Sequence, residues 1–132
     1  PLANILNGKG MKELYSHQIK ALDLIRDGKN VVVATPTASG KSLIYNLPVL
    51  ETIFNRPDTR ALYLFPLKAL AQDQKKSLQE LLSSAGHDFI PDICIYDGDT
   101  RSWQRSKIRQ KPPHILITNP DMLHLPILPY HY

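Results

Sequence analysis

Short apolar runs alternate with helix-like stretches four times along this chain, and this alternation restricts the fold more than any other feature. The runs are VVVA (31–34), RALYLFP (60–66), ICIYDG (93–98) and HILITNP (114–120). A strand, a helix and a further strand form a right-handed crossover, which makes the sheet parallel. We therefore expect an α/β fold, a parallel sheet with helices on both faces, in which the first two runs are buried strands.

Four stretches carry the period or the end signals of helices. They are SHQIKALDLIRDGKN (16–30), KSLIYNLPVLETIF (41–54), LKALAQDQKKSLQELLSSAG (67–86) and RSWQRSKIRQK (101–111). Ser16 is the expected cap of the first helix, and Gly28 and Gly86 are expected to end the first and third. Pro48 should bend the second. The buried stripe of the third helix is expected to consist of Leu67, Leu70, Leu78, Leu81 and Leu82.

The composition is that of a globular chain of about one domain. Its 132 residues are 42% hydrophobic and 21% charged, and the formal net charge of +4 permits a polyanionic partner. The single cysteine, Cys94, excludes an internal disulfide and is expected to point into the core. No apolar run reaches the roughly 18 residues of a membrane helix. We expect no membrane partner, and a location in the cytoplasm of a bacterium or the nucleus of a eukaryote.

A phosphate-binding loop is indicated between the first strand and the second helix. Gly40, Lys41 and Ser42 match the second half of the pattern G-x-x-x-x-G-K-[ST], while Thr35 replaces its first glycine. In this pattern the lysine reaches the β and γ phosphates, and the hydroxyl coordinates Mg²⁺. ATP and Mg²⁺ are therefore the expected cofactors, with Lys41 and Ser42 as catalytic residues and Ser42 as the metal ligand. The residues expected to surround the phosphates are Thr37, Ala38, Ser39, Gly40, Lys41 and Ser42.

Further motifs occur in order along the chain. They are LYSHQ (14–18), TPTASGKS (35–42), PLKALAQDQ (66–74), YDGDT (96–100) and TNPDML (118–123). Together they resemble the adenine-recognition motif, motifs I, Ia and Ib and the following threonine-bearing motif of superfamily 2 helicases. The combination is most similar to MrfA-type DEAD/DEAH-box DNA helicases. This resemblance implies a P-loop NTPase domain of the RecA-like type, present only in part.

The resemblance also implies roles for side chains outside the phosphate loop. Gln18 would pair with the adenine edge, and Tyr15 would either stack on the base or pack internally. Three loops at the carboxyl ends of strands would contact the backbone of a nucleic acid, with single-stranded DNA as the expected partner. Their residues are Pro66, Lys68, Gly98, Asp99, Thr100, Thr118 and Asn119. Lys68 is equally compatible with a solvated lysine near a helix start.

A basic run follows the third apolar run and includes the chain's only tryptophan. It consists of Arg101, Trp103, Arg105, Lys107, Arg109 and Lys111. One interpretation is an electrostatic contact to nucleic acid with a stacking aromatic ring. The interpretation that we favour is a solvated helix face with Trp103 packed inward. Asp97 and Asp99 are expected to form a turn and not a metal site.

No D-E-x-H box, which in the family positions Mg²⁺ and the attacking water, occurs in these residues. Asp121 lies late after its strand, beside Met122 where the box has glutamate, so it is a poor substitute. Residues 1–132 therefore resemble the front of a first RecA-like domain, without the rest of the helicase core. We expect an ATP-dependent DNA helicase as the parent protein, and no ATP turnover by these residues alone.

Two other function classes remain open at this point. A P-loop small-molecule kinase would need a lid with arginines and a substrate-binding acid, neither of which we find. A non-catalytic nucleotide or nucleic-acid binding module would keep the fold without a working phosphate loop, and the intact Gly40-Lys41-Ser42 argues against that class.

Overall fold

The computed structural model describes residues 14–36, 40–86 and 88–130. In chain order its elements are α2 (Ser16–Arg26), α3 (Lys41–Asn55), β1 (Ala61–Leu64), α4 (Lys68–Ala85), β2 (Ile93–Tyr96), α5 (Ser102–Gln110), β3 (Ile115–Thr118) and α6 (Pro120–Met122). Two short helical turns, η1 (Leu123–Ile127) and η2 (Leu128–Tyr130), follow. The expected helices are all present, with limits within a few residues of those that the sequence predicted. None of the helices in the described ranges is long and apolar enough to cross a membrane.

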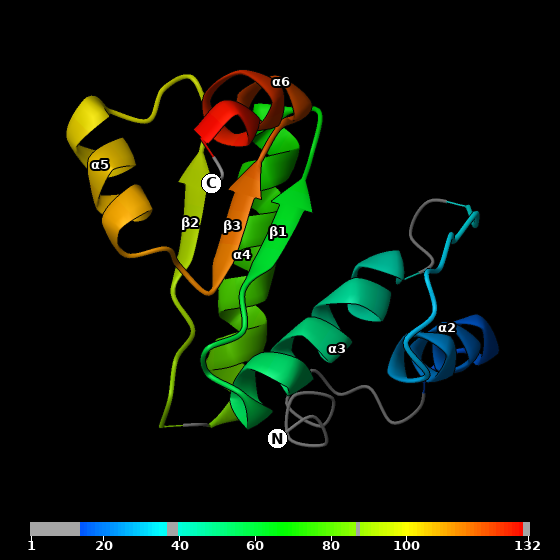
Figure 1. The fold of residues 1–132 in the computed structure, drawn as a ribbon. Coiled ribbons are helices and arrows are strands. Elements are labelled where there is room, and N and C mark those ends of the chain that lie inside the picture. Colours follow the sequence, from blue (N-terminus) through cyan, green and yellow to red (C-terminus); the bar gives the residue numbers. More distant parts are fainter. Residues whose placement is uncertain (1–13, 37–39, 87, 131–132) are drawn as a thin grey trace.

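The sheet has three strands in the order β1-β3-β2, and both pairings are parallel. Ile115 of the central strand pairs with Ala61 on one side and with Ile93 on the other. All three strands therefore end at the same edge of the sheet. Helix α4 runs along one face of the sheet, while α5 lies beside β2 (Figure 1). The predicted α/β class with a parallel sheet is confirmed.

The expected strand at 31–34 is absent, so the described sheet has three strands and not four. Residues 31–36 form neither helix nor strand, and the side chain of Val32 is 96% exposed. This part of the prediction was wrong because an apolar run indicates what a strand would bury and not whether a neighbouring strand is available to pair with it. Within the described residues, β1 and β2 are the edge strands of the sheet, and the run at 31–34 pairs with neither of them.

Strand β1 was also expected to be buried on both faces, and only one face is. Tyr63 is buried against the helices, whereas Leu62 and Leu64 are 48% and 44% exposed. Successive side chains of a strand point to opposite faces. The face of β1 that carries the two leucines is therefore open in the described part of the chain.

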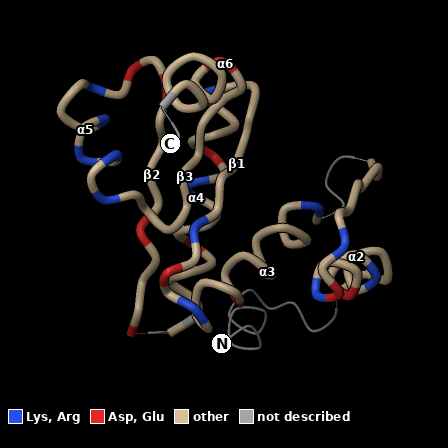
Figure 2. Tube along the Cα trace, viewed as in Figure 1, with Lys and Arg blue, Asp and Glu red and all other residues tan. Residues whose placement is uncertain are grey.

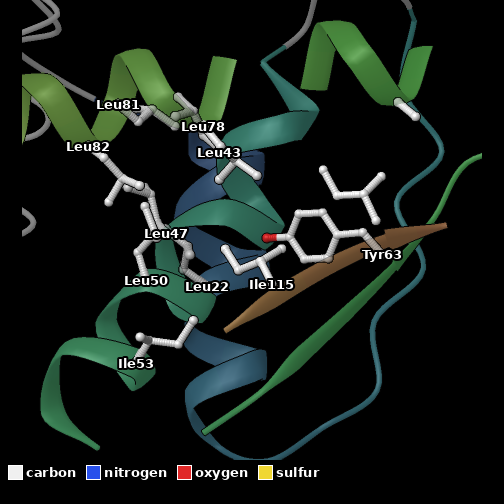
Figure 3. Close-up of a cluster of buried hydrophobic side chains, with 12 residues drawn as sticks. Leu22, Leu43, Leu47, Leu50, Ile53, Tyr63, Leu78, Leu81, Leu82 and Ile115 are labelled. Atoms are coloured by element: carbon white, nitrogen blue, oxygen red, sulfur yellow. The ribbon is translucent and has the colours of Figure 1, made fainter. Parts of the chain in front are cut away.

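The hydrophobic core lies between α3, α4 and the inner face of the sheet (Figure 3). Its fully buried side chains are Leu47, Leu50, Ile53, Leu78, Leu81, Ile115 and Ile117. Of the stripe predicted for α4, Leu78, Leu81 and Leu82 are buried, whereas Leu67 and Leu70 are exposed. The predicted leucine stripe is therefore buried only in the later turns of α4, and Ala71 is the residue of the first turn that joins the core.

Helix α3 continues through Pro48, which is buried in its middle. Proline has no N–H to donate to the carbonyl four residues earlier. The hydroxyl of Thr52 donates to the Pro48 carbonyl at 2.7 Å, so a side chain also bonds to the backbone in this part of the helix. On the side facing β1, Asn46 Oδ1 accepts a 2.9 Å hydrogen bond from the hydroxyl of Tyr63, whose pKa is raised by burial.

Candidate nucleotide and nucleic-acid site

Gly40 forms the start of helix α3 and adopts a left-handed backbone with φ of 72°. A side chain at this position would be strained by the backbone angle and would also collide with the amide nitrogen of Gln18. The first turn of α3 contains no acidic residue, so the partial positive charge of the helix N-terminus is not offset there. This end of the helix suits an anion. The predicted contacts Thr37, Ala38 and Ser39 lie outside the described residues.

Lys41 folds back over the segment that precedes the phosphate loop. Its ammonium donates hydrogen bonds to the carbonyls of Thr35 and Pro36, at 2.6 and 2.7 Å. These two bonds link the first turn of α3 to the chain on the other side of the loop. Ser42, half-buried, follows in the same turn. The structure therefore places both predicted catalytic residues at the loop.

Gln18 joins helix α2 to the phosphate loop. Its side chain is only 2% exposed, and its amide nitrogen donates to the Gly40 carbonyl at 3.0 Å. Its amide oxygen accepts from the backbone N–H of Tyr15 at 2.8 Å. Tyr15, and not the predicted Ser16, occupies the N-cap position of α2, because Gln18, the third residue of the helix, accepts the hydrogen bond from the Tyr15 N–H.

Tyr15 has a ring that is free of the core. The side chain is 67% exposed and its ring stacks with that of His17, with centroids 5.8 Å apart. Tyr15 was expected either to stack on the base or to pack internally, and the structure excludes internal packing. Adenine recognition by Gln18 and Tyr15 remains a prediction.

The start of α3 and the segment at 31–36 do not lie at the edge where the described strands end. In Figure 1, the segment before α3 lies near α2, on the side of α3 away from the sheet. The motifs that follow β1, β2 and β3 share one edge of the sheet, as predicted for the three loops, and the start of α3 lies apart from it. The cause is the missing strand at 31–34, whose end would have positioned the loop.

At the carboxyl ends of the strands, the loops after β1 and β2 are joined by an ion pair. The ammonium of Lys68 lies 2.7 Å from a carboxylate oxygen of Asp99. The hydrogen bond to Asp99 raises the pKa of Lys68, so the lysine is protonated at neutral pH. Both side chains are more than half exposed, so the pair is accessible to solvent and to a competing anion.

The turn after β2 is held together by Asp97. One carboxylate oxygen of this buried residue accepts from the Asp99 N–H at 2.9 Å, and its backbone N–H donates to the hydroxyl of Thr100 at 2.9 Å. The Gly98 N–H makes none of these bonds. No cluster of three or more potential metal ligands occurs among the described residues, and Asp97 serves the turn as predicted.

Arg105 fixes the same turn from helix α5. Its guanidinium donates to the carbonyls of Thr100 and Asp97 at 2.9 and 3.0 Å and lies 5.2 Å from the centre of the Tyr96 ring. In the sequence, Arg105 belongs to a run of basic residues, and the spacing of that run gives no sign that Arg105 has a separate structural role. Its role depends on where the helix meets the turn, which the sequence pattern does not specify.

The loop after β3 contributes side chains that are already engaged. Thr118 is 2% exposed, and its hydroxyl donates to the Tyr96 carbonyl at 2.5 Å. Asn119 Oδ1 accepts from the Met122 N–H at 2.9 Å and so caps α6. Pro66 is exposed at the end of β1. The structure thus brings the predicted nucleic-acid contacts to one edge, with several of their side chains used to shape the loops.

The basic run forms helix α5, which carries several positive charges beside β2 (Figure 2). None of its residues is buried, and Trp103 is 61% exposed. The expectation that Trp103 packs inward was wrong. Helix α5 packs too loosely against the sheet to bury the indole ring. Cys94, expected in the core, is only half-buried in β2 beside this helix.

The model of the family described as DEAD/DEAH box helicase matches residues 15–131. The chain belongs to this family. Among curated relatives of this DEAD/DEAH box chain, it is 53% identical over 126 residues to the ATP-dependent helicase YprA of Bacillus subtilis, a match that covers 96% of this chain and 16% of YprA. It is 41% identical over 127 residues to the ATP-dependent helicase HRQ1 of Saccharomyces cerevisiae, covering 96% of this chain and 12% of HRQ1.

Solved structures of other helicases resemble this DEAD/DEAH box chain in fold. The crystal structure of the DUF1998 helicase MrfA bound to DNA and AMPPNP matches with a TM-score of 0.88 and 52% identity, over 97% of this chain and 18% of MrfA. The Mycobacterium smegmatis helicase Lhr bound to ssDNA and AMP-PNP matches with a TM-score of 0.80 and 30% identity, over 92% of this chain and 17% of Lhr. The chain thus spans less than a fifth of the length of these proteins.

Proposed function

We propose that these residues form the nucleotide-binding front part of the first RecA-like domain of an ATP-dependent DNA helicase. The observation that carries this proposal is the arrangement around Lys41, whose ammonium bonds to the Thr35 and Pro36 carbonyls at the end of α3 where no acidic residue offsets the helix dipole. The named relatives are ATP-dependent helicases, and two matching structures hold an ATP analogue with DNA.

Nucleotide binding would exchange internal contacts of the loop for contacts to phosphate. The Lys41 ammonium would leave the carbonyls of Thr35 and Pro36 for the β and γ phosphates, which carry full negative charge. Ser42 would place its hydroxyl as a ligand of the Mg²⁺ that accompanies ATP. The exposed ring of Tyr15 would contact the base, next to the amide of Gln18.

Nucleic-acid binding would use the edge where β1, β2 and β3 end. Lys68 would pair with a backbone phosphate, and the turn at 98–100 would offer the Gly98 N–H. Thr118 and Asn119 would support this surface by holding the loop after β3 in shape. Contacts of this kind recognise the backbone and not the base sequence, which suits a protein that moves along DNA.

We further propose binding without turnover for the 132 residues themselves. Hydrolysis requires an acid that positions Mg²⁺ and the attacking water. These residues contain no D-E-x-H box, and Asp121, in the first turn of the short helix α6, belongs to the edge of β3 and not to the phosphate loop. Work done by the whole protein would depend on the parts that the relatives carry beyond this region.

The proposal is tested by titrating the chain into a fluorescein-labelled oligo-dT at about 20 mM and about 150 mM salt, with and without an ATP analogue. We expect anisotropy to rise at low salt and the affinity to fall as salt increases, because phosphate contacts release counterions. A labelled ATP analogue should bind in a parallel titration. An unchanged anisotropy at low salt would overturn the DNA-binding half of the proposal, and failure of the nucleotide to bind would overturn the other half.

The Asp99→Asn variant should bind oligo-dT more tightly than the parent chain, by roughly twofold to fivefold. The substitution removes the carboxylate that occupies Lys68 and also removes a negative charge from the DNA-binding edge. The same anisotropy titration measures the gain. Asp58→Asn is the matched control, because this exposed residue lies before β1, at the opposite edge of the sheet, and its substitution makes the same change in net charge. Equal gains in both variants would mean that Lys68 does not contact the phosphates.

A further inference from the structure

A cleft of about 550 Å³ lies between helix α5, strand β2 and helix α4. It exists because α5 stands away from the sheet and buries none of its residues. Apolar residues that line the cleft include Cys94, Ile95, Ile108 and Pro113. This cleft is separate from the start of α3, and none of its lining residues belongs to α2 or α3 (Figure 1).

The side chain of Trp103 also lines this cleft, from the first turn of α5. At 61% exposure, most of the indole surface is in contact with solvent. Aromatic rings presented in this way serve as platforms on which the bases of a single strand stack, and such stacking does not depend on base identity. The ring therefore offers an apolar surface that nothing else in the described residues covers.

The charges around the cleft favour an anion. Lys75 of α4 and Lys107 and Lys111 at the end of α5 line it, against one carboxylate, Asp92. Figure 2 shows that further basic residues lie along α5 itself. A flat apolar group that carries negative charge matches both the ring and the lysines. A nucleotide within a single strand has this combination of properties.

The cleft is continuous with the edge proposed for DNA. Thr100, which closes the turn after β2, lines the cleft as well. Arg105 ties this turn to α5 through two carbonyls, so the cleft and the turn are held in a fixed relation. A single-stranded nucleic acid that contacts the turn at 98–100 can therefore reach Trp103 directly along the cleft.

We propose that this cleft is a second contact for single-stranded nucleic acid, in which a base stacks on Trp103 and the adjoining phosphates pair with Lys107 and Lys111. The inference rests on the proposed function, since it requires a strand at the edge where β2 ends. It adds a binding step at α5, outside the loops at the carboxyl edge. The single-stranded nucleic acid would leave the carboxyl edge of the sheet and continue alongside β2 toward the start of that β-strand.

The test uses the fluorescence of Trp103, which is the only tryptophan of the chain. Oligo-dT titrated at low salt should quench this fluorescence in step with the rise in anisotropy of the labelled strand. Trp103→Ala should weaken binding roughly tenfold and Trp103→Phe much less, because phenylalanine keeps a stacking surface. Lys107→Gln with Lys111→Gln should lower the slope of log affinity against log salt by ~1.4, the loss expected for two phosphate contacts.

The matched control is Lys20→Gln with Lys29→Gln, which removes the same charge outside the cleft. Lys20 is exposed in α2, and Lys29 is exposed just after this helix. Circular dichroism checks that each variant is folded. A rise in anisotropy without quenching would overturn this inference and leave the proposed function intact, whereas no rise in anisotropy would overturn both this inference and the DNA-binding half of the proposed function. Equal quenching by poly-glutamate at matched charge would also overturn it, because the cleft would then be a site for acidic polypeptides.

Discussion

Lys41→Ala should abolish measurable binding of a fluorescent ATP analogue at concentrations where the unsubstituted chain is half saturated. The ammonium supplies charge-assisted hydrogen bonds to phosphate, and losing it should cost about 3 kcal/mol, or roughly 100-fold in affinity. The starting point is favourable for this role, since the Lys41 ammonium already bonds to the carbonyls of Thr35 and Pro36. A fluorescence titration with the labelled nucleotide measures the effect.

Lys29→Ala is the control for this experiment, because Lys29 is exposed just after α2 and outside the loop. Its affinity for the nucleotide should match that of the parent chain. The melting temperature of Lys41→Ala should be recorded too, since the substitution removes two internal hydrogen bonds. Tight nucleotide binding by a folded Lys41→Ala variant would exclude the phosphate loop as the nucleotide site.

Gly40→Ala should destabilise the fold by about 3 kcal/mol. A left-handed backbone costs alanine about 1–2 kcal/mol, and displacing the Gln18 amide sacrifices two hydrogen bonds of about 1 kcal/mol each. The relevant geometry is the φ of 72° and the collision of a new Cβ with Gln18 Nε2. Thermal unfolding should show a melting temperature lowered on the order of 10 °C.

Gly28→Ala separates the two contributions to this loss. Gly28 has nearly the same backbone angle, with φ of 74°, but nothing lies within 4 Å of a Cβ built there. Its substitution should therefore cost only the backbone part, about 1 kcal/mol. If both variants lose the same stability, then the contact between Gln18 and Gly40 contributes nothing to the fold.

Much of the fold could be predicted because its signals are local. Apolar runs bounded by proline or by a polar turn identified β1, β2 and β3, and Gly86, with φ of 58°, ends α4 where the sequence placed its limit. The Gly40-Lys41-Ser42 pattern likewise identified the start of α3. In each case a residue type limits the backbone at its own position, so no knowledge of distant neighbours is required.

Apart from the cap of α2, where Tyr15 replaces the predicted Ser16, the failures concern partners that are distant in sequence. The run at 31–34 lacks a neighbouring strand, and Trp103 lacks a surface to pack against. Gln18 bonds to Gly40, 22 residues away, and Lys68 to Asp99, 31 residues away. Composition and periodicity give each residue's preference for burial but not its distant partner, so these contacts required the three-dimensional structure.

Helix α2 is anchored to α3 at two points, by Gln18 at the Gly40 carbonyl and by Arg26, whose guanidinium lies 3.3 Å from the Glu51 carboxylate. Two attachments on one short rod leave it little freedom to pivot independently. A helix of 11 residues is about 16 Å long, so the two anchors hold α2 near both of its ends. Any displacement of Gly40 would therefore be transmitted to α2 and α3 together.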